Sequence, residues 1–176
     1  MSKIALTPNA SGTGTLTIAA PNTSTDRTLT LPDSTGTIDT LGRAGNVLQV
    51  VESTSIDTTY IASTSFQDLD LNVSITPSSS SSKILIMVSG AYTQDGVDNT
   101  LAYIQLVRDS TAIASHLAGY DTPGGNVGFD FYIQKLDSPA TTSAITYKLQ
   151  ARTDNASSTF RPQGSGASII AMEIAA

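Results

Sequence analysis

The stretch Lys83–Ser89, which reads KILIMVS, decides the fold class of this chain. It holds five consecutive apolar residues, shows neither a helix cap nor helical spacing, and directly follows five serines, Ser78–Ser82. Successive side chains of a strand point to opposite sides, so such a run is typical of a strand that is covered on both faces. In an all-β chain the opposing sheet covers one face, and we expect a second subunit to cover the other.

The composition of the 176-residue chain also favours an all-β protein. Charged residues make up 14% of the chain, well below the usual share, and Ser and Thr together make up roughly a quarter of it. Threonine has a high strand propensity and serine favours turns, so these residues suit strands whose outer faces carry hydroxyl groups.

Charge and cysteine content exclude several classes of function. The net charge is −6 and the nine basic residues are scattered singly, which argues against a nucleic-acid partner because phosphate binding needs clustered Lys and Arg. The absence of cysteine excludes disulfides and cysteine-based metal sites. The first residues lack the apolar core of a signal peptide, and no apolar run reaches membrane-spanning length. We expect no membrane partner.

The first 46 residues differ from the rest and predict an extended β arm. Short alternating pieces, Thr15–Ile18, Thr28–Leu31 and Gly36–Asp39, are separated by Pro, Gly, Asn and Asp. A segment this thin cannot bury its own apolar side, so we expect it to lie against copies of itself or against another protein. A disordered polar arm is the alternative. The apolar side of the arm carries Leu16, Ile18, Leu29, Leu31 and Ile38.

A glycine-containing segment, Leu41–Asn46, predicts a hinge, and we place the domain boundary there: arm 1–46, globular domain 47–176. The pattern beyond it predicts about eight strands in an antiparallel β-sandwich of jelly-roll type. Residues 58–66 are ambiguous, and 120–126 and 153–166 are expected to be loops. The predicted strands are Val47–Val51, Leu69–Ile75, Lys83–Ser89, Leu101–Arg108, Thr111–His116, Val127–Lys135, Ala144–Arg152 and Ala167–Ile174.

Two strands, Lys83–Ser89 and Ala167–Ile174, are apolar on both faces. We therefore predict that they lie in one sheet near a subunit interface. Burying one extra face would stabilise association by roughly 1.5–3 kcal/mol for each large side chain. The predicted interface residues are Leu85, Met87, Ile170 and Met172.

Residues that could carry catalysis are few. His116 is the only histidine and ends a predicted strand beside Ser115. A Ser-His-Asp triad needs three convergent groups, and the chain lacks the Gly-x-Ser-x-Gly elbow, so we expect His116 to be an exposed strand-end residue. A glycosidase-type depolymerase would need paired acids in a groove, and the sequence nominates none. We expect a protein that is not an enzyme.

Candidate ligand sites are equally weak in the sequence. Asp95 and Asp98 share a short loop, but the spacing of a calcium loop is missing, so a solvated turn is the better interpretation. We expect neither a metal nor a cofactor. Four tyrosines could stack on sugars if they gathered at one end of the molecule, although core or interface use is the default. They are Tyr92, Tyr103, Tyr120 and Tyr132.

Several motifs resemble tailed-phage fibre and related virion proteins of marine and cyanobacterial phages. The segment Thr28–Ile38, TLTLPDSTGTI, is similar to segments near the N-termini of these proteins. Further similar segments run through the globular part, and the resemblance covers nearly the whole chain. These segments are Gly45–Val51, Val73–Pro77, Ser81–Leu85, Leu106–Thr111 and Met172–Ala175.

The resemblance implies a virion component, often trimeric, made in a host cytoplasm and exposed on the particle. Its arm would dock on the major capsid protein or another virion protein, and its sandwich would face outward. No shaft separates the two parts, which favours a capsid decoration, cement or short head-fibre protein. The alternative is a tail-fibre tip that recognises host glycans through the loops Asp121–Asn126 and Thr153–Gly166. The predicted docking arm carries Leu16, Ile18, Leu29, Leu31, Pro32 and Ile38.

Overall fold

The computed structural model describes residues 11–15, 17, 19, 22–26, 28, 43–55, 60–96, 99–120, 127–162 and 167–176. The chain divides into two units, Met1–Thr37 and Ile38–Ala176. The described residues of the first unit are exposed and lie in no strand. All six predicted docking positions lie outside the described residues, so the docking arm and the boundary at residue 46 stay predictions. These positions are Leu16, Ile18, Leu29, Leu31, Pro32 and Ile38.

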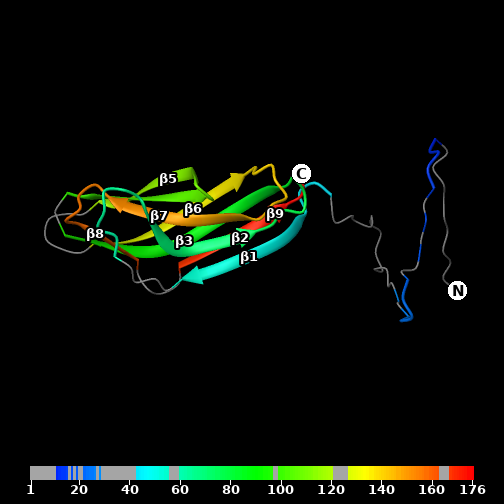
Figure 1. Ribbon diagram of the computed structural model, residues 1–176, viewed down its shortest axis with the longest axis horizontal. Coiled ribbons are helices and arrows are strands. Elements are labelled where there is room, and N and C mark those ends of the chain that lie inside the picture. Colours follow the sequence, from blue (N-terminus) through cyan, green and yellow to red (C-terminus); the bar gives the residue numbers. More distant parts are fainter. Residues whose placement is uncertain are drawn as a thin grey trace. The chain divides into compact units, whose positions relative to one another are not determined.

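Nine strands make up the described part of the second unit (Figure 1). Each of the eight predicted strands is present. Most of them are longer than predicted, because backbone pairing continues past the last residue of the apolar alternation. The strands are β1 Val47–Ser55, β2 Gln67–Ile75, β3 Lys83–Asp95, β4 Leu101–Arg108, β5 Thr111–Tyr120, β6 Val127–Asp137, β7 Ile145–Thr153, β8 Thr159–Pro162 and β9 Ala167–Ile174.

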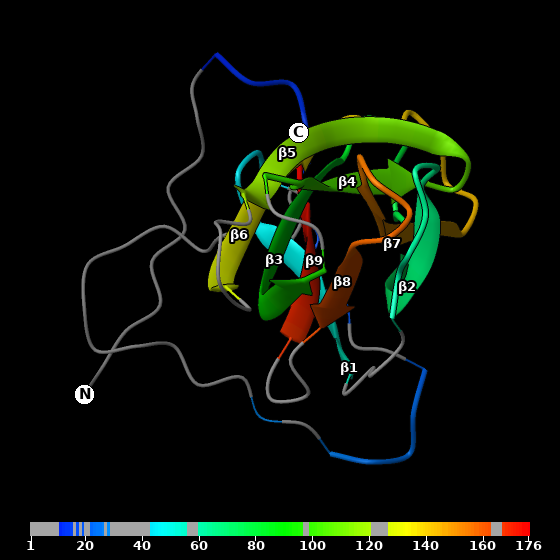
Figure 2. The ribbon, with the colours of Figure 1, turned by 90° about the vertical axis from the view of Figure 1, so that its left-hand side faces the viewer.

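The strands form two antiparallel sheets that pack as a sandwich. Sheet A has the order β1-β9-β3-β6, with β8 pairing to the second half of β3, and sheet B has the order β2-β7-β4-β5. Figure 2 shows the two layers end on. The chain changes sheets at every step except β4 to β5 and β8 to β9, and the resulting strand orders are those of a jelly roll. The predicted sandwich is confirmed, and β3 and β9 are neighbours in one sheet as predicted.

The core lies between the two sheets and follows the alternation seen in the sequence. From sheet A, Ile84, Ile86 and Val88 of β3 are fully buried. From sheet B, alternate residues of β2 and β7 are buried, because every second side chain of a half-covered strand faces the other sheet. These positions are Leu69, Leu71, Val73, Ile75, Ile145, Tyr147 and Leu149.

The expectation of an uninterrupted loop over 153–166 is wrong, because Thr159–Pro162 form β8. Its centre, Phe160, is fully buried and exchanges two backbone hydrogen bonds of 2.8 Å with Ile61. In the ambiguous segment 58–66, of which residues 60–66 are described, Ile61 forms an isolated bridge to Phe160. A four-residue strand with one apolar side chain is too short to produce a recognisable alternation.

An aromatic cluster fills one end of the core. The Tyr92 ring stacks on Phe160 and Phe129, with centroid distances of 4.5 and 5.6 Å, and Phe131 lies 6.3 Å away. Gly119 of β5 faces this cluster, and a Cβ there would lie directly against the Tyr92 hydroxyl and 2.8 Å from Phe129 Cδ2. The absence of a side chain at residue 119 therefore lets the second half of β3 pack against β5 and β6.

Among the residues that the structure describes, there is no helix long and apolar enough to cross a membrane.

We predict that Gly119→Ala destabilises the sandwich, whereas Gly128→Ala does not. Tyr92 is fully buried and stacked, so it cannot move away from the new methyl group, and overpacking of this kind costs about 1–3 kcal/mol. A Cβ at Gly128 meets its nearest atom at 3.7 Å, which is an ordinary contact. Urea denaturation of the two variants measures the difference; equal stabilities would contradict this account of the aromatic cluster.

Candidate functional site

The outer face of sheet A carries apolar side chains across all four of its long strands. One row of directly opposed residues crosses from edge to edge, and the rows beside it pair Met87 with Ile170 and Val47 with Ile174. The row that spans the sheet consists of Val50, Met172, Leu85 and Leu136. Together with Met87, Ile170, Val47 and Ile174, these residues form what we call the apolar face.

The apolar face remains open to solvent in the single chain. Val47, Val50 and Leu136 are 51%, 55% and 50% exposed, and the other five residues are partly exposed. The structure places Leu85 opposite Met172 and Met87 opposite Ile170, so the four residues predicted for the subunit interface lie together. Whether another subunit covers them is untested. The other four members escaped sequence reasoning, because Val47 and Val50 are three residues apart and only a register shift between Val47 and Gln49 puts both on this face.

The outer face of sheet B is mainly polar over β2, β7 and β4. Asp68 accepts hydrogen bonds from Lys148 Nζ at 2.8 Å and from Gln150 Nε2 at 2.7 Å, and these bonds lower the pKa of the Asp68 carboxyl. Gln105 in turn donates to Gln150 Oε1 at 2.6 Å. This chain of contacts fixes long polar side chains on the sheet, so the two outer faces of the sandwich differ in chemistry.

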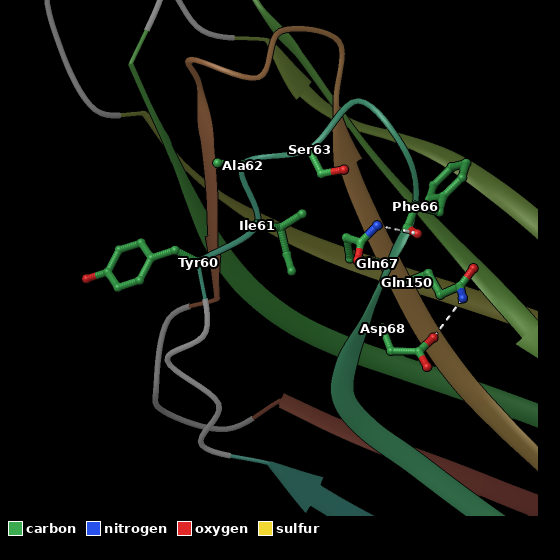
Figure 3. Close-up of a pocket in the computed structure, with 8 residues that line it drawn as sticks. All are labelled: Tyr60, Ile61, Ala62, Ser63, Phe66, Gln67, Asp68 and Gln150. Carbon is green, nitrogen blue, oxygen red and sulfur yellow. Dashed lines mark hydrogen bonds between the residues drawn. The ribbon is translucent and has the colours of Figure 1, made fainter.

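A groove of about 740 Å³ opens where β2 begins. Figure 3 shows that the segment from Tyr60 to Phe66 bends back toward β2, with Gln67, Asp68 and Gln150 on the far side of the groove. Sequence reasoning missed this groove, because it depends on how an irregular segment folds against two strands. Its lining consists of Tyr60, Ile61, Ala62, Ser63, Phe66, Gln67, Asp68 and Gln150.

Arginine side chains rigidify the aromatic residues around the groove. The Arg161 guanidinium lies 4.3 Å from the centroid of the Tyr60 ring. Arg152 lies 4.0 Å from the Tyr103 ring and 5.3 Å from Phe66. Cation–π contacts of this length hold rings in one orientation. Among the four tyrosines considered for sugar stacking, Tyr92 is in the core, Tyr132 is exposed on β6, and nothing is described of the Tyr120 side chain. The three described side chains, Tyr92, Tyr103 and Tyr132, do not gather at one site.

A partly buried ion pair joins the two sheets. Arg108 Nη1 of β4 donates to both carboxylate oxygens of Asp137, at 2.9 and 2.8 Å, and the Tyr147 hydroxyl donates to Asp137 Oδ2 at 2.7 Å. Burial and the Asp137 carboxylate raise the pKa of Tyr147 well above its ordinary value. The three bonds to Asp137 fasten β6 of sheet A to β4 and β7 of sheet B.

The serine tract before β3 also has a structural role. Ser78 donates to Glu173 Oε1 from its backbone amide and from its hydroxyl, both at 2.7 Å, and Gln49 Nε2 donates to Oε2 at 2.6 Å. The Glu173 side chain is fully buried. Burial alone would raise the pKa of Glu173, but the hydrogen bonds from Ser78 and Gln49 outweigh it, and the pKa falls to about 2.

Residues considered for chemistry are not brought together. His116 is exposed on β5, opposite Ile104. Asp95 ends β3, and Asp98 lies outside the described residues. Of the two loops considered for glycan binding, 121–126 lies outside the described residues, and so does the last part, 163–166, of Thr153–Gly166. In the described ranges, no group of three or more His, Cys, Asp and Glu side chains could hold a metal ion. That the protein is not an enzyme and takes no cofactor stays a prediction.

Comparison with known proteins yields distant structural likeness alone. No family model matches the sequence, and no curated protein matches it. A structure of the infectious bursal disease virus Gx strain aligns with a TM-score of 0.40 and 16% identity, over 73% of this chain and 37% of that chain. The VP2 subviral particle of the same virus aligns with a TM-score of 0.37 and 18% identity, over 82% of this chain and 36% of that chain. The chain thus spans well under half of either structure, and the assignment as a jelly roll rests on its own strand order.

We predict that Glu173→Gln weakens the sandwich at neutral pH and flattens its acid sensitivity. Loss of the charged hydrogen bonds should cost about 1.5–3 kcal/mol at pH 7. The folded-state pKa lies below the ordinary value of 4.5, so the contribution of Glu173 is present above pH 4.5 and disappears as the pH falls toward about 2.

Chemical denaturation between pH 7 and pH 2 measures this effect. The control is Glu52→Gln, which changes the other glutamate of the chain, an exposed residue on β1. The gap between wild type and Glu173→Gln should narrow below pH 4.5, and a constant gap would show that the charge of Glu173 contributes nothing.

Proposed function

We propose that this chain is a non-enzymatic structural protein of a virion that associates with copies of itself through the apolar face of sheet A. In the finer form of the proposal, it is a homotrimeric capsid decoration, cement or short head-fibre protein. The observation that carries the proposal is the row of four opposed apolar residues across the whole width of an exposed sheet. A protein that stays monomeric gives no reason for such a row.

The energetics of the apolar face favour association. Single exposed apolar residues are common on monomers, but contiguous patches of them mark interaction sites. Complete burial contributes roughly 1.5–3 kcal/mol for each large side chain, so the four residues of the spanning row are enough to offset a sizeable part of the cost of association. Sheet B of the same chain, whose outer face is polar, shows that the fold itself does not require an apolar outer face.

The charges at the margin of the apolar face favour a second copy as the occupant. Lys83 lies opposite Ile174, and Glu52 lies opposite Ile170, so one positive and one negative residue border the patch. A surface that carries both signs can be complementary to itself, because the lysine of one copy can approach the glutamate of the next.

The virion setting rests on the resemblance of the sequence to phage fibre and related virion proteins. In that setting the arm would anchor each copy to the major capsid protein or to another virion protein, and the sandwich would project outward. The net charge of −6 per chain would help to keep a densely occupied surface soluble. The tail-fibre alternative places the same chain at far lower copy number.

We predict that Leu85→Glu and Leu136→Glu reduce the oligomer to monomers, because each places a carboxylate within the row that spans the apolar face. Leu117→Glu is the matched control: Leu117 lies on β5 of sheet B and is 51% exposed, against 50% for Leu136. Sedimentation velocity at micromolar concentration measures the mass. A monomeric wild type, or an oligomer that survives both changes, would contradict the proposal.

Deletion of residues 1–40 is predicted to abolish attachment to particles while the sandwich stays folded. The measurement is co-sedimentation of purified protein with particles that lack it, with full-length protein as the reference. Attachment by the shortened chain at an undiminished level would exclude the arm as the anchor.

Quantitative mass spectrometry of intact particles measures the number of copies of this chain per particle. Hundreds of copies are expected for a decoration protein, and a few dozen at most for a tail appendage.

A further inference from the structure

We propose that β6 forms a second contact between copies of this chain, in which two β6 strands pair edge to edge and antiparallel about a two-fold axis. This contact lies at the edge of sheet A, so it goes beyond the association through the apolar face. In the described part of the chain, β6 pairs with β3 alone, and Figure 2 shows β6 at the margin of sheet A. An edge strand presents unpaired N–H and C=O groups, which are a template for pairing with another chain.

Among the long strands at the sheet edges, β6 has an unbroken register. The other edge strands, β1, β2 and β5, each show at least one register shift against the strand beside them. In contrast, all residues of β6 from Val127 to Asp137 pair with β3 in one continuous register. Bulges and prolines are two devices that protect edge strands from pairing with other chains, and β6 contains neither. Its edge is therefore regular enough to accept another strand.

The accessible part of the β6 edge runs from Asp130 to Leu136. The neighbouring strand β5 reaches β6 at Phe129, where a Cβ on Gly119 would lie 2.8 Å from the Phe129 ring. Beyond this point the described residues give β6 no backbone hydrogen-bond partner other than β3. Every second residue of this part is exposed, which leaves the strand open to an approaching copy.

The side chains of β6 favour a second β6 as the occupant of this edge. Tyr132 and Leu136 are 55% and 50% exposed, and they lie two positions on either side of Gln134 on the outer face. In an antiparallel pair whose two-fold axis passes at Gln134, each Tyr132 lies opposite Leu136 of the other copy. The two Gln134 amides then lie side by side, where one can donate to the other. Cross-strand pairs of this kind are what stabilise antiparallel strands.

The charges of β6 are compatible with this register. Lys135 would lie opposite Ile133 of the other copy, and Asp130 would lie opposite Ser138, so no like charges are directly opposed. A register centred on Ile133 would instead place Asp130 opposite Leu136. Because the axis is perpendicular to the sheet, the long strands of both copies form one continuous sheet, and both apolar faces point to the same side.

The edge contact is expected to be weaker than association through the apolar face. A single pair of strands is marginal in water, so we expect β6 pairs to form at about 1 mM and not at micromolar concentration. Copies that are crowded on one surface reach effective concentrations of this order. A Leu85→Glu chain should therefore be monomeric at micromolar concentration and should still pair through β6 when it is concentrated.

Disulfide cross-linking tests the register, because the chain has no cysteine of its own. Gln134→Cys places two thiols opposite each other, and directly opposed residues of antiparallel strands have Cα atoms about 4.5–5.5 Å apart, a span that a disulfide bridges. The matched control is Asp130→Cys on the same face of the same strand, because its two thiols would be about 27 Å apart along the strands. Both changes are made in the Leu85→Glu chain, so the outcome does not depend on the apolar face.

We expect Gln134→Cys to form a disulfide dimer at least ten times faster than Asp130→Cys, as measured by non-reducing electrophoresis in oxidised glutathione at about 1 mM protein. Adding Tyr132→Lys should remove this advantage, because it disrupts both pairs with Leu136. Thermal melting reports whether each variant keeps its fold.

Amide hydrogen exchange gives a second measurement that leaves β6 unchanged. In the Leu85→Glu chain without added cysteine, exchange of residues 130–136 should slow between micromolar and millimolar concentration, whereas exchange of β1 and β5 should not. Equal cross-linking rates at positions 134 and 130, an advantage that survives Tyr132→Lys, or slowing in β1 or β5 in place of β6 would each overturn the proposal.

Discussion

Two strands of sheet A must be covered on both sides, and the rest of the molecule follows from that constraint. The inward side chains of β3 and β9, among them Ile84, Ile86 and Ile169, are satisfied by sheet B. The outward ones are not satisfied by anything in the described part of the chain. A jelly roll solves only half of the problem, because its two layers can bury one face of each sheet. The remaining face is the surface through which we propose that copies of the chain associate.

Much of the fold could be predicted because it depends on local alternation. In β2, the alternate spacing of apolar residues is enough to predict that Leu69 and Val73 are buried. The pairing of β3 with β9 was predictable for a different reason, since two strands that are apolar on both faces belong in the middle of a sheet. The strand β8 could not be predicted in this way. Its one apolar residue, Phe160, becomes a core residue through pairing with β3 and Ile61, which are distant in sequence.

The polar residues were the hardest to interpret, because their roles depend on partners far along the chain. Glu173 looks like a charge in an apolar strand until Ser78, 95 residues away, is seen to supply two hydrogen bonds to it. Asp137 looks like a turn residue until Arg108 and Tyr147 reach it from the other sheet. The groove shares this character, since Asp68 and Gln150 are 82 residues apart. The spacing of apolar residues in the sequence therefore predicted the two sheets. The roles of the polar residues became visible only in the three-dimensional structure.

The difference between the two outer faces determines how the proposed contacts fit together. A sandwich that associates through sheet A turns the outer face of sheet B away from the contact, because the two outer faces are on opposite sides of the core. The groove beside β2 and β7 then stays accessible in every copy. Sheet B, whose outer face is mainly polar over β2, β7 and β4, therefore suits the side that faces solvent in the proposed assembly.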